Sequence, residues 1–475
     1  MTSSIKAAFA KKAHQTTEEK YHEMIERPIA PLITSLAIPS IMANLVTALY
    51  NLVDMYFVGH ISTAASGAIG ISFVAMTAIQ ATGFYFGQGT GNAISRYLGA
   101  QQQEKANIMA STGLVCTFVV GLCIALLGNI FIEPLCILAG ATSTILPYAK
   151  TFIGIILCGA PWMAGSILLN MQLRFEGESL FSMLAITTGA VLNALLTPLL
   201  IFGFHLGIAG SAISTISCEF IGFVLLLFEA QKIGLTPLSF KWVRPTTELF
   251  REINNGGVPS FIRQLMLGIA TTLLNNAAAP FGDAAVAAMA IVQRITGFAN
   301  YIQIGIGQGY QPVLGYNIGA RHHERVLEGY TFALRAATIC VLIIGVGTCV
   351  FAPQLIWIFR QDPDVVAIGT LTLRVASFSA ALTGVAMITN FMLQTSGHVW
   401  GASILGACRL GLVLGPAVVI MTHFFGLLGV QLAQPVADLI TFFVAIPYAK
   451  ITLSQFNTTA KVEESIREIQ AWIWQ

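Results

Sequence analysis

Charged side chains are scarce in this sequence. Asp, Glu, Lys and Arg make up 10% of its 475 residues, whereas hydrophobic residues make up 55%. Because soluble globular domains carry about 25% charged residues, this shortage excludes an ordinary soluble domain. The formal net charge is only +2, and it gives no reason to expect a nucleic-acid partner. The composition instead indicates a chain whose main partner is the lipid bilayer.

Motifs for metal and covalent chemistry are also missing. The eight cysteines are scattered without a CxxC pair, so the sequence predicts packing residues rather than a disulfide framework. No HxxxH or HExxH pattern is present, and we expect no metal site. A polytopic membrane enzyme such as an acyltransferase would need a His, Asp and Glu constellation near one membrane interface, which we do not find. We therefore expect neither an enzyme nor a cofactor.

Long apolar runs dominate the rest of the chain. Runs such as 108–132, 180–204 and 404–428 each exceed the ~20 residues that a helix needs to cross a bilayer. Their continuous apolar character favours helices, since barrel strands would alternate over ~10 residues. The sequence therefore predicts an all-α membrane protein. Its twelve predicted spans are residues 29–58, 66–97, 106–131, 145–171, 180–204, 207–232, 251–281, 285–318, 326–352, 366–394, 401–424 and 427–452.

The chain consists largely of two copies of one sequence repeat. Residues 87–100 read GQGTGNAISRYLGA and residues 307–320 read GQGYQPVLGYNIGA, 220 positions later. The same step relates Pro39-Ser40 to Pro259-Ser260. Each copy holds six predicted spans, an even number, so both copies enter the membrane from the same side. We therefore expect two six-helix lobes related by a pseudo-twofold axis along the membrane normal, with a substrate path between the halves.

The predicted domain organisation follows from this repeat and from the polar segments. It comprises an N-terminal arm (1–27), an N-lobe with helices 1–6 (28–233), an inter-lobe linker (234–250), a C-lobe with helices 7–12 (251–452) and a C-terminal tail (453–475). Lys and Arg are counted 17 to two in favour of the side that carries the arm, the linker and the tail. By the positive-inside rule, both termini are expected in the cytoplasm. The arm lacks the apolar core of a signal peptide, so we expect no cleavage.

Ionisable residues inside spans are few. The acids that lie clearly within spans are Asp54, Glu219 and Asp438. An intramembrane acid usually marks an ion or substrate path. Asp54 ends a polar seam on one face of the first span, formed by Ser40, Asn44, Thr47 and Asn51. This pattern predicts a functional carboxylate in a wet lumen, although Asp54 could also simply reach interfacial water at the outer end of its helix.

Glu219 and Asp438 occupy equivalent positions, 219 residues apart. They could form a pair of binding groups, or they could be partners for arginines inside spans, which are Arg263, Arg294, Arg335, Arg374 and Arg409. The GQG triplets are expected to allow close helix packing, and the alternative is that they face the substrate or act as a hinge. Buried amides need hydrogen-bond partners, and they either bond to each other or line a central cavity. The candidate cavity residues are Asn44, Asn51, Asn170, Gln264, Gln308 and Asn390.

Three stretches carry a family resemblance. Residues 36–59, LAIPSIMANLVTALYNLVDMYFVG, resemble the first helix of multidrug and toxic compound extrusion (MATE) transporters. The stretch GQGYQPVLGYNIGA resembles span eight of the MepA-like bacterial branch, and RFEGES at 174–179 resembles the loop after span four. The matching first-helix positions are Pro39, Tyr50, Asn51, Asp54 and Gly59.

This resemblance implies an antiporter in the bacterial cytoplasmic membrane. It would exchange lipophilic, often cationic compounds for protons or sodium ions, acting as a monomer. By resemblance, Asp54 binds the coupling ion, the first helix bends at Pro39, and Asn193 and Thr215 complete the ion site. One position departs from the family, because Thr197 stands where members carry a second acid before a proline. A site with one carboxylate favours protons over a dehydrated sodium ion, without excluding sodium.

An alternative within the same superfamily is a flippase for lipid-linked glycans. Its cavity would face a pyrophosphate and should be rich in Arg and Lys. Three intramembrane arginines keep this alternative open, namely Arg263, Arg294 and Arg374. The sequence alone does not name the substrate or the coupling ion.

Overall fold

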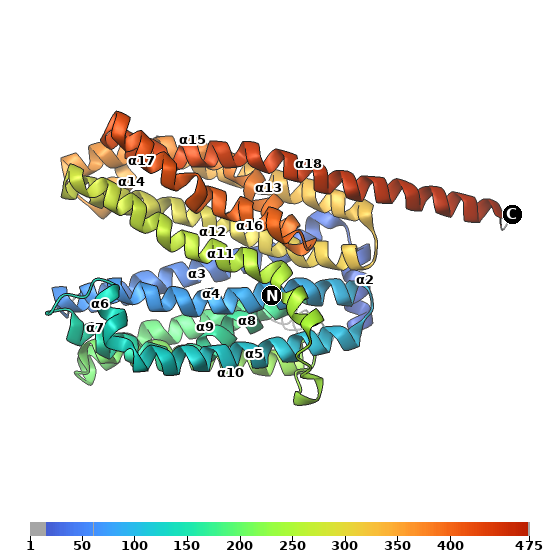
Figure 1. The fold of residues 1–475 in the computed structure, drawn as a ribbon, viewed down its shortest axis with the longest axis horizontal. Coiled ribbons are helices and arrows are strands. Elements are labelled where there is room, and N and C mark those ends of the chain that lie inside the picture. The colour runs from blue at the N-terminus through green and yellow to red at the C-terminus, as the bar shows by residue number, and fades with distance from the viewer. Residues whose placement is uncertain (1–15, 60, 474–475) are drawn as a thin grey trace, which may run out of the picture. The chain divides into compact units, whose positions relative to one another are not determined.

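The computed structural model describes residues 16–59 and 61–473, with side chains for all of these except 51, 54, 55, 63, 64, 66 and 458–473. Every regular element in this part of the chain is a helix (Figure 1). The first half contains α2 (Thr17–Glu26), α3 (Ile29–Gly59), α4 (Thr63–Gly99), α5 (Gln103–Ile130), α6 (Ile132–Leu138), α7 (Leu146–Cys158), α8 (Ala160–Phe175), α9 (Ser179–Pro198), the π-helix η1 (Leu199–Gly203), α10 (Gly207–Lys232) and the 3₁₀-helix η2 (Phe240–Trp242).

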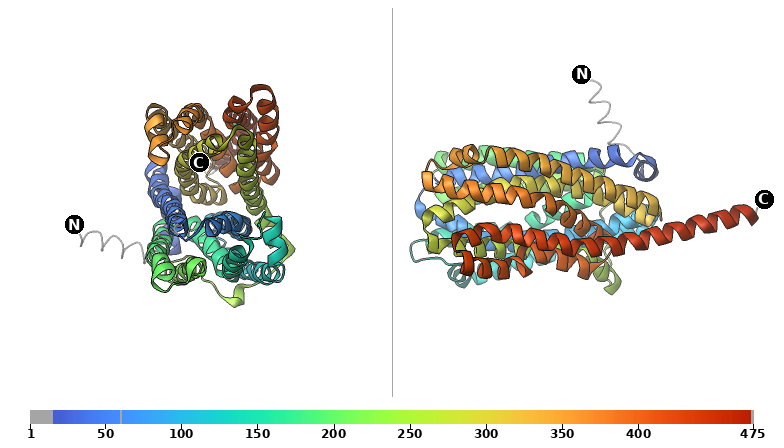
Figure 2. Two further views of the ribbon diagram at one scale, coloured as in Figure 1. Left: turned by 90° about the vertical axis from the view of Figure 1, so that its left-hand side faces the viewer. Right: turned by 90° about the horizontal axis from the view of Figure 1, so that it is seen from above.

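The second half has a similar but not identical order. It contains α11 (Thr247–Ala278), the 3₁₀-helix η3 (Ala279–Phe281), α12 (Asp283–Gly319), α13 (His323–Val350), α14 (Ala352–Phe359), α15 (Pro363–Thr395), α16 (Val399–Ala407), the π-helix η4 (Cys408–Leu412), α17 (Leu414–Phe425) and α18 (Leu427–Ile473). α18 continues beyond the other helices of the second half, so part of the predicted C-terminal tail is helical (Figures 1 and 2).

The twelve predicted spans are confirmed. Eleven helices of the described chain are long and apolar enough to cross a membrane, and the bent pair α7–α8 supplies the twelfth span. The bend of 53° falls at Gly159, between the two helices, just before Pro161. Proline lacks an amide hydrogen and clashes with the preceding turn, which explains the break. The sequence predicted span four as one continuous helix and missed this bend.

The chain divides into two compact units whose borders do not follow the repeat everywhere. The first unit comprises Met1–Arg27 and Met42–Phe261, and the second comprises Pro28–Ile41 and Ile262–Gln475. The borders inside α3 and α11 therefore fall two residues after Pro39 and Pro259, which are equivalent positions of the repeat. The predicted lobe limits of 28–233 and 251–452 remain a prediction.

Each unit packs its helices through glycines. In the first unit, a Cβ on Gly87 of α4 would lie 3.1 Å from Met171 of α8. In the second unit, a Cβ on Gly307 of α12 would lie 2.1 Å from Phe391 of α15, which is the repeat equivalent of Met171. A methyl group at Gly307 would overlap the Phe391 ring, whereas one at Gly87 would require only a small shift of the Met171 side chain. The prediction that the GQG triplets serve helix packing is confirmed.

The N-terminal arm contains a helix that docks on the first unit. Thr16 and Glu19 form a reciprocal capping box, with bonds of 2.9 and 3.2 Å, and this box starts α2. Two side chains of α2 are almost fully buried, Lys20 at 1% exposure and Met24 at 0%. Lys20 Nζ lies 2.9 Å from a carboxylate oxygen of Glu178, so the buried ammonium is paired.

The loop between α8 and α9 receives this helix. Gly177 has a φ of +92°, and the amides of Gly177 and Glu178 donate to Arg174 and Leu173 as in a Schellman helix end. The preceding residue, Glu176, is buried and accepts bonds from the Leu235 amide, at 2.7 Å, and from the Thr236 hydroxyl. Burial raises the pKa of Glu176 to about 7.

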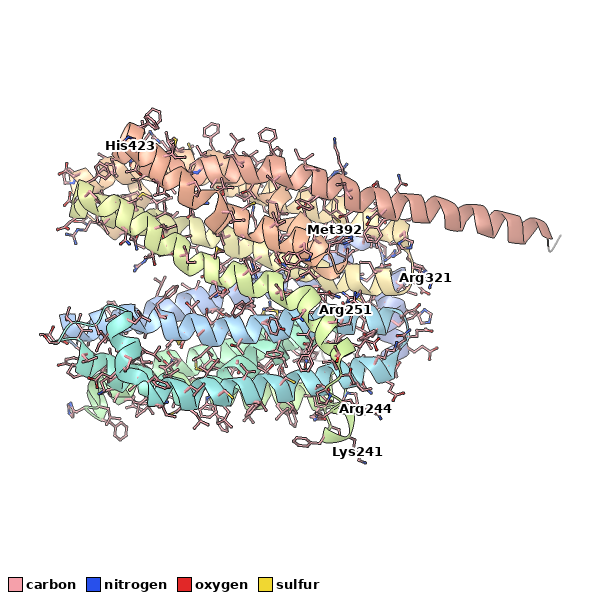
Figure 3. The ribbon with its side chains drawn as sticks, in the orientation of Figure 1. Lys241, Arg244, Arg251, Arg321, Met392 and His423 are labelled. Atoms are coloured by element: carbon pink, nitrogen blue, oxygen red, sulfur yellow. The ribbon has the colours of Figure 1, made fainter. Side chains whose placement is uncertain are left out.

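Basic side chains gather at one end of the first unit. Lys241, Arg244 and Arg251, in and beside the connection from η2 to α11, lie at the same end of its helices (Figure 3). In the second unit, Arg321 lies at the end opposite to His423 (Figure 3). The orientation of the termini relative to the membrane stays a prediction.

Candidate functional site

A cluster of neutral polar side chains lies between α9 and α10 of the first unit. Thr197 Oγ1 lies 3.2 Å from Asn193 Oδ1 and 2.9 Å from Ser214 Oγ. Asn193 Nδ2 donates to Ser214 Oγ at 3.3 Å. All three side chains have 0% exposure. The structure thus brings together two predicted ion-site residues, Asn193 and Thr197, and adds Ser214.

Thr215, the third predicted residue of this cluster, follows Ser214 on α10. Its exposure is 3%, and its hydroxyl has no hydrogen-bond partner among the described residues. A buried hydroxyl without a partner is uncommon, because desolvating a polar group is unfavourable. Thr215 therefore offers an oxygen that a further group could use.

Local sequence explains how the cluster forms. Pro198 follows Thr197 and cannot donate a backbone hydrogen bond, and α9 passes into the π-helix η1 at the next residue. Gly210 lets α10 approach this turn, since a Cβ there would lie 2.8 Å from the Leu200 backbone. Ser214 was missed by the sequence reasoning. The spacing of small polar residues on α10, at 211, 214, 215 and 218, is the helical signal that could have identified it.

The cluster carries no charged side chain of its own. Its oxygens and amide can bond to a neighbouring acid or to a cation, but they supply no negative charge. The predicted acid, Asp54, is in α3, and its side chain lies outside the described residues, as does that of Asn51. The geometry between Asp54 and the cluster therefore stays a prediction.

The remaining polar seam of α3 is partly satisfied within the helix. Ser40 Oγ donates to the Leu36 carbonyl, and Thr47 Oγ1 donates to the Ala43 carbonyl, both at 2.9 Å. Asn44 is half-buried. Pro39 is buried inside a continuous α3, and the border between the two units falls just beyond it.

Two predicted cavity amides join helices within their own units. Asn170 on α8 donates to the Ser182 hydroxyl on α9. Its repeat equivalent, Asn390 on α15, donates at 2.6 Å to the carbonyl of Ala402 on α16, the position equivalent to Ser182. Both amides are therefore used in matching helix-to-helix bonds.

The other predicted cavity residues differ in their burial. Gln308 is 6% exposed, and Gln264 is half-buried. Contact between any of these amides and a substrate stays a prediction.

The intramembrane acids Asp438 and Glu219 have different surroundings. Asp438 is 4% exposed and accepts from Arg409 Nε at 2.8 Å, from Ser379 Oγ at 2.9 Å and from Gln434 Nε2 at 3.1 Å. The interpretation of this acid as an arginine partner is confirmed. Glu219 is half-buried and has no ion pair with another described residue. The two acids are equivalent in sequence but not in structure.

Metal ligands are not gathered anywhere in the described part of the chain. No group of three or more His, Cys, Asp or Glu side chains there could hold a metal ion.

The repeated helical fold and its intramembrane polar groups define a polytopic transporter architecture, and comparison with known proteins identifies the family. The MatE family model matches twice, at residues 39–199 and 259–419. The two matches are again 220 residues apart, so each repeat matches the model separately. The chain belongs to the MatE family.

Characterised relatives cover nearly the whole chain. The multidrug export protein MepA of Staphylococcus haemolyticus is 26% identical over 90% of this chain and 95% of its own length. MepA of Staphylococcus saprophyticus is 28% identical over 86% of this chain and 91% of its own length. Both are named as export proteins, which supports a transporter rather than an enzyme.

Solved structures give the same result. A MATE family transporter in an outward-facing conformation has a TM-score of 0.86 at 26% identity, and the alignment covers 93% of this chain and 99% of that one. A MATE structure described as bent has a TM-score of 0.87 at 25% identity, covering 94% and 100%. A structure described as straight gives the same values. The prediction of a twelve-helix MATE fold in two lobes is confirmed.

Proposed function

We propose that this protein is a multidrug efflux antiporter that exports lipophilic or cationic compounds in exchange for protons, with Asp54 as the coupling acid. It would act as a monomer in the bacterial cytoplasmic membrane, with both termini in the cytoplasm. The observation that supports this proposal is the neutral cluster of Asn193, Thr197 and Ser214, which contains two of the residues that the sequence analysis assigned to the ion site. The names of the MepA relatives support export of drugs.

The composition of the cluster favours protons over sodium. A dehydrated sodium ion is best held by several oxygens and by enough negative charge to replace its water. Thr197 replaces the second acid with a hydroxyl, and its bonds to Asn193 and Ser214 involve no ionised group. A single carboxylate surrounded by neutral donors and acceptors can instead take up one proton and change its hydrogen bonds accordingly.

The proposed cycle uses Pro39 as the bend point of α3. The missing backbone hydrogen bond at proline makes bending there easier than elsewhere in the helix. In our proposal, protonation of Asp54 favours the bent helix, and loss of the proton favours the straight one. This coupling requires that the two conformations bind the proton with different affinity. The unit border just after Pro39, and the bent and straight structures of related MATE proteins, support this assignment.

The arginines that suggested the flippase alternative differ in their surroundings. The guanidinium carbon of Arg263 lies over the Phe391 ring, 5.9 Å from the ring centroid, and Nε of this arginine is buried without a hydrogen-bond partner among the described residues. Arg374 is exposed and donates to the Cys349 carbonyl at 3.3 Å. The unpartnered Nε of Arg263 keeps the flippase as the second candidate function, while the names of the MepA relatives favour drug efflux.

Everted membrane vesicles provide the test. We expect a fluorescent lipophilic cation to be transported under a proton gradient and not under a sodium gradient. Asp54→Asn should insert normally and abolish gradient-driven transport, and Asp54→Glu should restore part of it. Glu133→Gln is the matched control, because Glu133 is an acid on α6, which lies outside the spans, and it already pairs with Lys150. Parent rates in Asp54→Asn would refute the role of Asp54, and sodium-driven transport would refute proton coupling.

A further inference from the structure

We infer that the GQG glycines Gly89 and Gly309 form a reciprocal gate that closes the membrane side on which α2 lies. Each glycine receives the N-terminal half of the first helix of the opposite repeat. The inference rests on the proposed transport function, because it concerns which contacts must part when the two repeats move. It assigns a conformational role to glycines beyond packing within one repeat.

The first contact, which we call the α11 seat, joins α4 to residues 247–261 of α11. A Cβ on Gly89 would lie 2.4 Å from the carbonyl oxygen of Ile253. On the facing helix, a Cβ on Gly257 would lie 2.5 Å from the carbonyl oxygen of Tyr85. Ordinary contact for a Cβ begins at 3.4 Å, so the two backbones touch only because both positions are glycine.

The second contact, which we call the α3 seat, joins α12 to residues 28–41 of α3. A Cβ on Gly309 would lie 2.5 Å from the backbone nitrogen of Ala37. A Cβ on Gly305, one turn earlier, would lie 2.4 Å from the Ile41 side chain and 2.8 Å from its backbone. Gly309 is the repeat equivalent of Gly89, so the same glycine of each repeat receives a helix of the other.

Neighbouring glycines of the same triplets have a different role. Gly87 faces Met171 of its own repeat, and Gly307 faces Phe391 of its own repeat. The two outer glycines of each triplet are two residues apart and therefore have different roles. The first glycine holds its repeat together, and the last glycine holds the opposite repeat.

The borders of the compact units show how far each exchanged segment extends. Residues 28–41 belong to the first repeat but pack in the second unit. Residues 247–261 of α11 belong to the second repeat but pack in the first unit. Both exchanges end two residues after a proline, Pro39 or Pro259. If the two repeats are the moving bodies, these segments must leave their seats when this side of the membrane opens.

The α11 seat has a polar addition. Arg96 Nη2 on α4 lies 2.5 Å from Glu252 on α11, and Tyr85 donates at 2.5 Å to Asn254. The side chains of Arg96 and Glu252 are 18% and 30% exposed, so the pair is reachable by water. A partly exposed pair is suited to a contact that forms and breaks, because each charge can be hydrated when the seat opens.

Hydrogen exchange of the purified full-length protein in lipid nanodiscs tests the gate. In Gly89→Ala, the new methyl group must move the α11 backbone by about 1 Å (3.4 minus 2.4 Å) to reach ordinary contact. We expect exchange to rise by at least about tenfold in residues 247–261 and also in residues 28–41. Gly87→Ala is the matched control on the same helix and should leave both segments unchanged.

The reciprocal rise is the decisive result, because a local packing defect would expose only the segment that faces residue 89. A rise confined to 247–261, or no rise in either segment, would overturn the gate. If Gly89→Ala does not fold, Glu252→Gln replaces it, with the same two segments as readout. Transport by the parent protein in everted vesicles is measured separately, so failure of the proposed function is distinguishable from failure of the gate.

Discussion

Replacing Gly177 by alanine should release the N-terminal helix α2. The residue has a φ of +92°, a conformation that costs a residue with a side chain about 1–2 kcal/mol. A Cβ would also lie 2.0 Å from Met24 Cε and 2.6 Å from Lys20 Cε, so the docked helix must shift. Loss of the buried Met24 contact adds about 1.5–3 kcal/mol. We expect a total destabilisation of docked α2 of about 2.5–5 kcal/mol.

Limited trypsin digestion measures this release. Lys20 is 1% exposed in the docked helix, so cleavage after it requires α2 to open. We expect cleavage at this site to accelerate by at least about tenfold in Gly177→Ala. Gly140→Ala is the matched control, because Gly140 has a φ of +97° and no atom within 4 Å of the added Cβ. Equal cleavage rates in the two variants would show that overlap with α2 plays no part.

Two further predictions concern buried acids. Asp438→Asn should lower the unfolding free energy in detergent by about 3 kcal/mol, because it leaves the partly buried Arg409, 19% exposed, without its carboxylate. Adding Arg409→Met should restore part of the loss, and an Asp438→Asn variant as stable as the parent would contradict this prediction. Glu176 has its pKa raised to about 7 by burial, so it stabilises the fold below pH 4.5 and loses that contribution as pH rises through 7. Thermal unfolding should therefore show the unfolding free energy falling by about 3 kcal/mol or less as the pH rises across this range. Glu176→Gln should remove this dependence on pH, and an unchanged dependence in the variant would assign it to other groups.

Much of the fold was predictable because membrane insertion depends on local composition. All twelve spans were predicted from the length of the apolar runs, and the repeat was predicted from identical residues 220 positions apart. The break at Gly159 was missed because Pro161 lies inside an apolar run whose hydropathy does not change. Hydropathy reports whether a segment enters the bilayer, and it says nothing about its straightness.

The candidate site was predictable only in part. Asn193 and Thr197 lie four residues apart on one helix, so their proximity is a local property. Ser214 joins them through packing of α10 against α9, which no spacing within α9 reveals. The equivalent positions of Glu219 and Asp438 in the repeat did not predict that only Asp438 has an arginine partner. Arg409 reaches Asp438 from η4, a separate helix segment.

The sequence by itself determined that this chain is a twelve-span, twice-repeated membrane protein, since hydrophobic transfer depends on residue type summed over about 20 positions. Tertiary structure alone decided which helix each surface touches. It placed the N-terminal halves of α3 and α11 on Gly309 and Gly89 of the opposite repeats, and it buried Lys20 beside Glu178. Such contacts depend on the shape and charge of two surfaces far apart in the chain, and they form only when both surfaces fit.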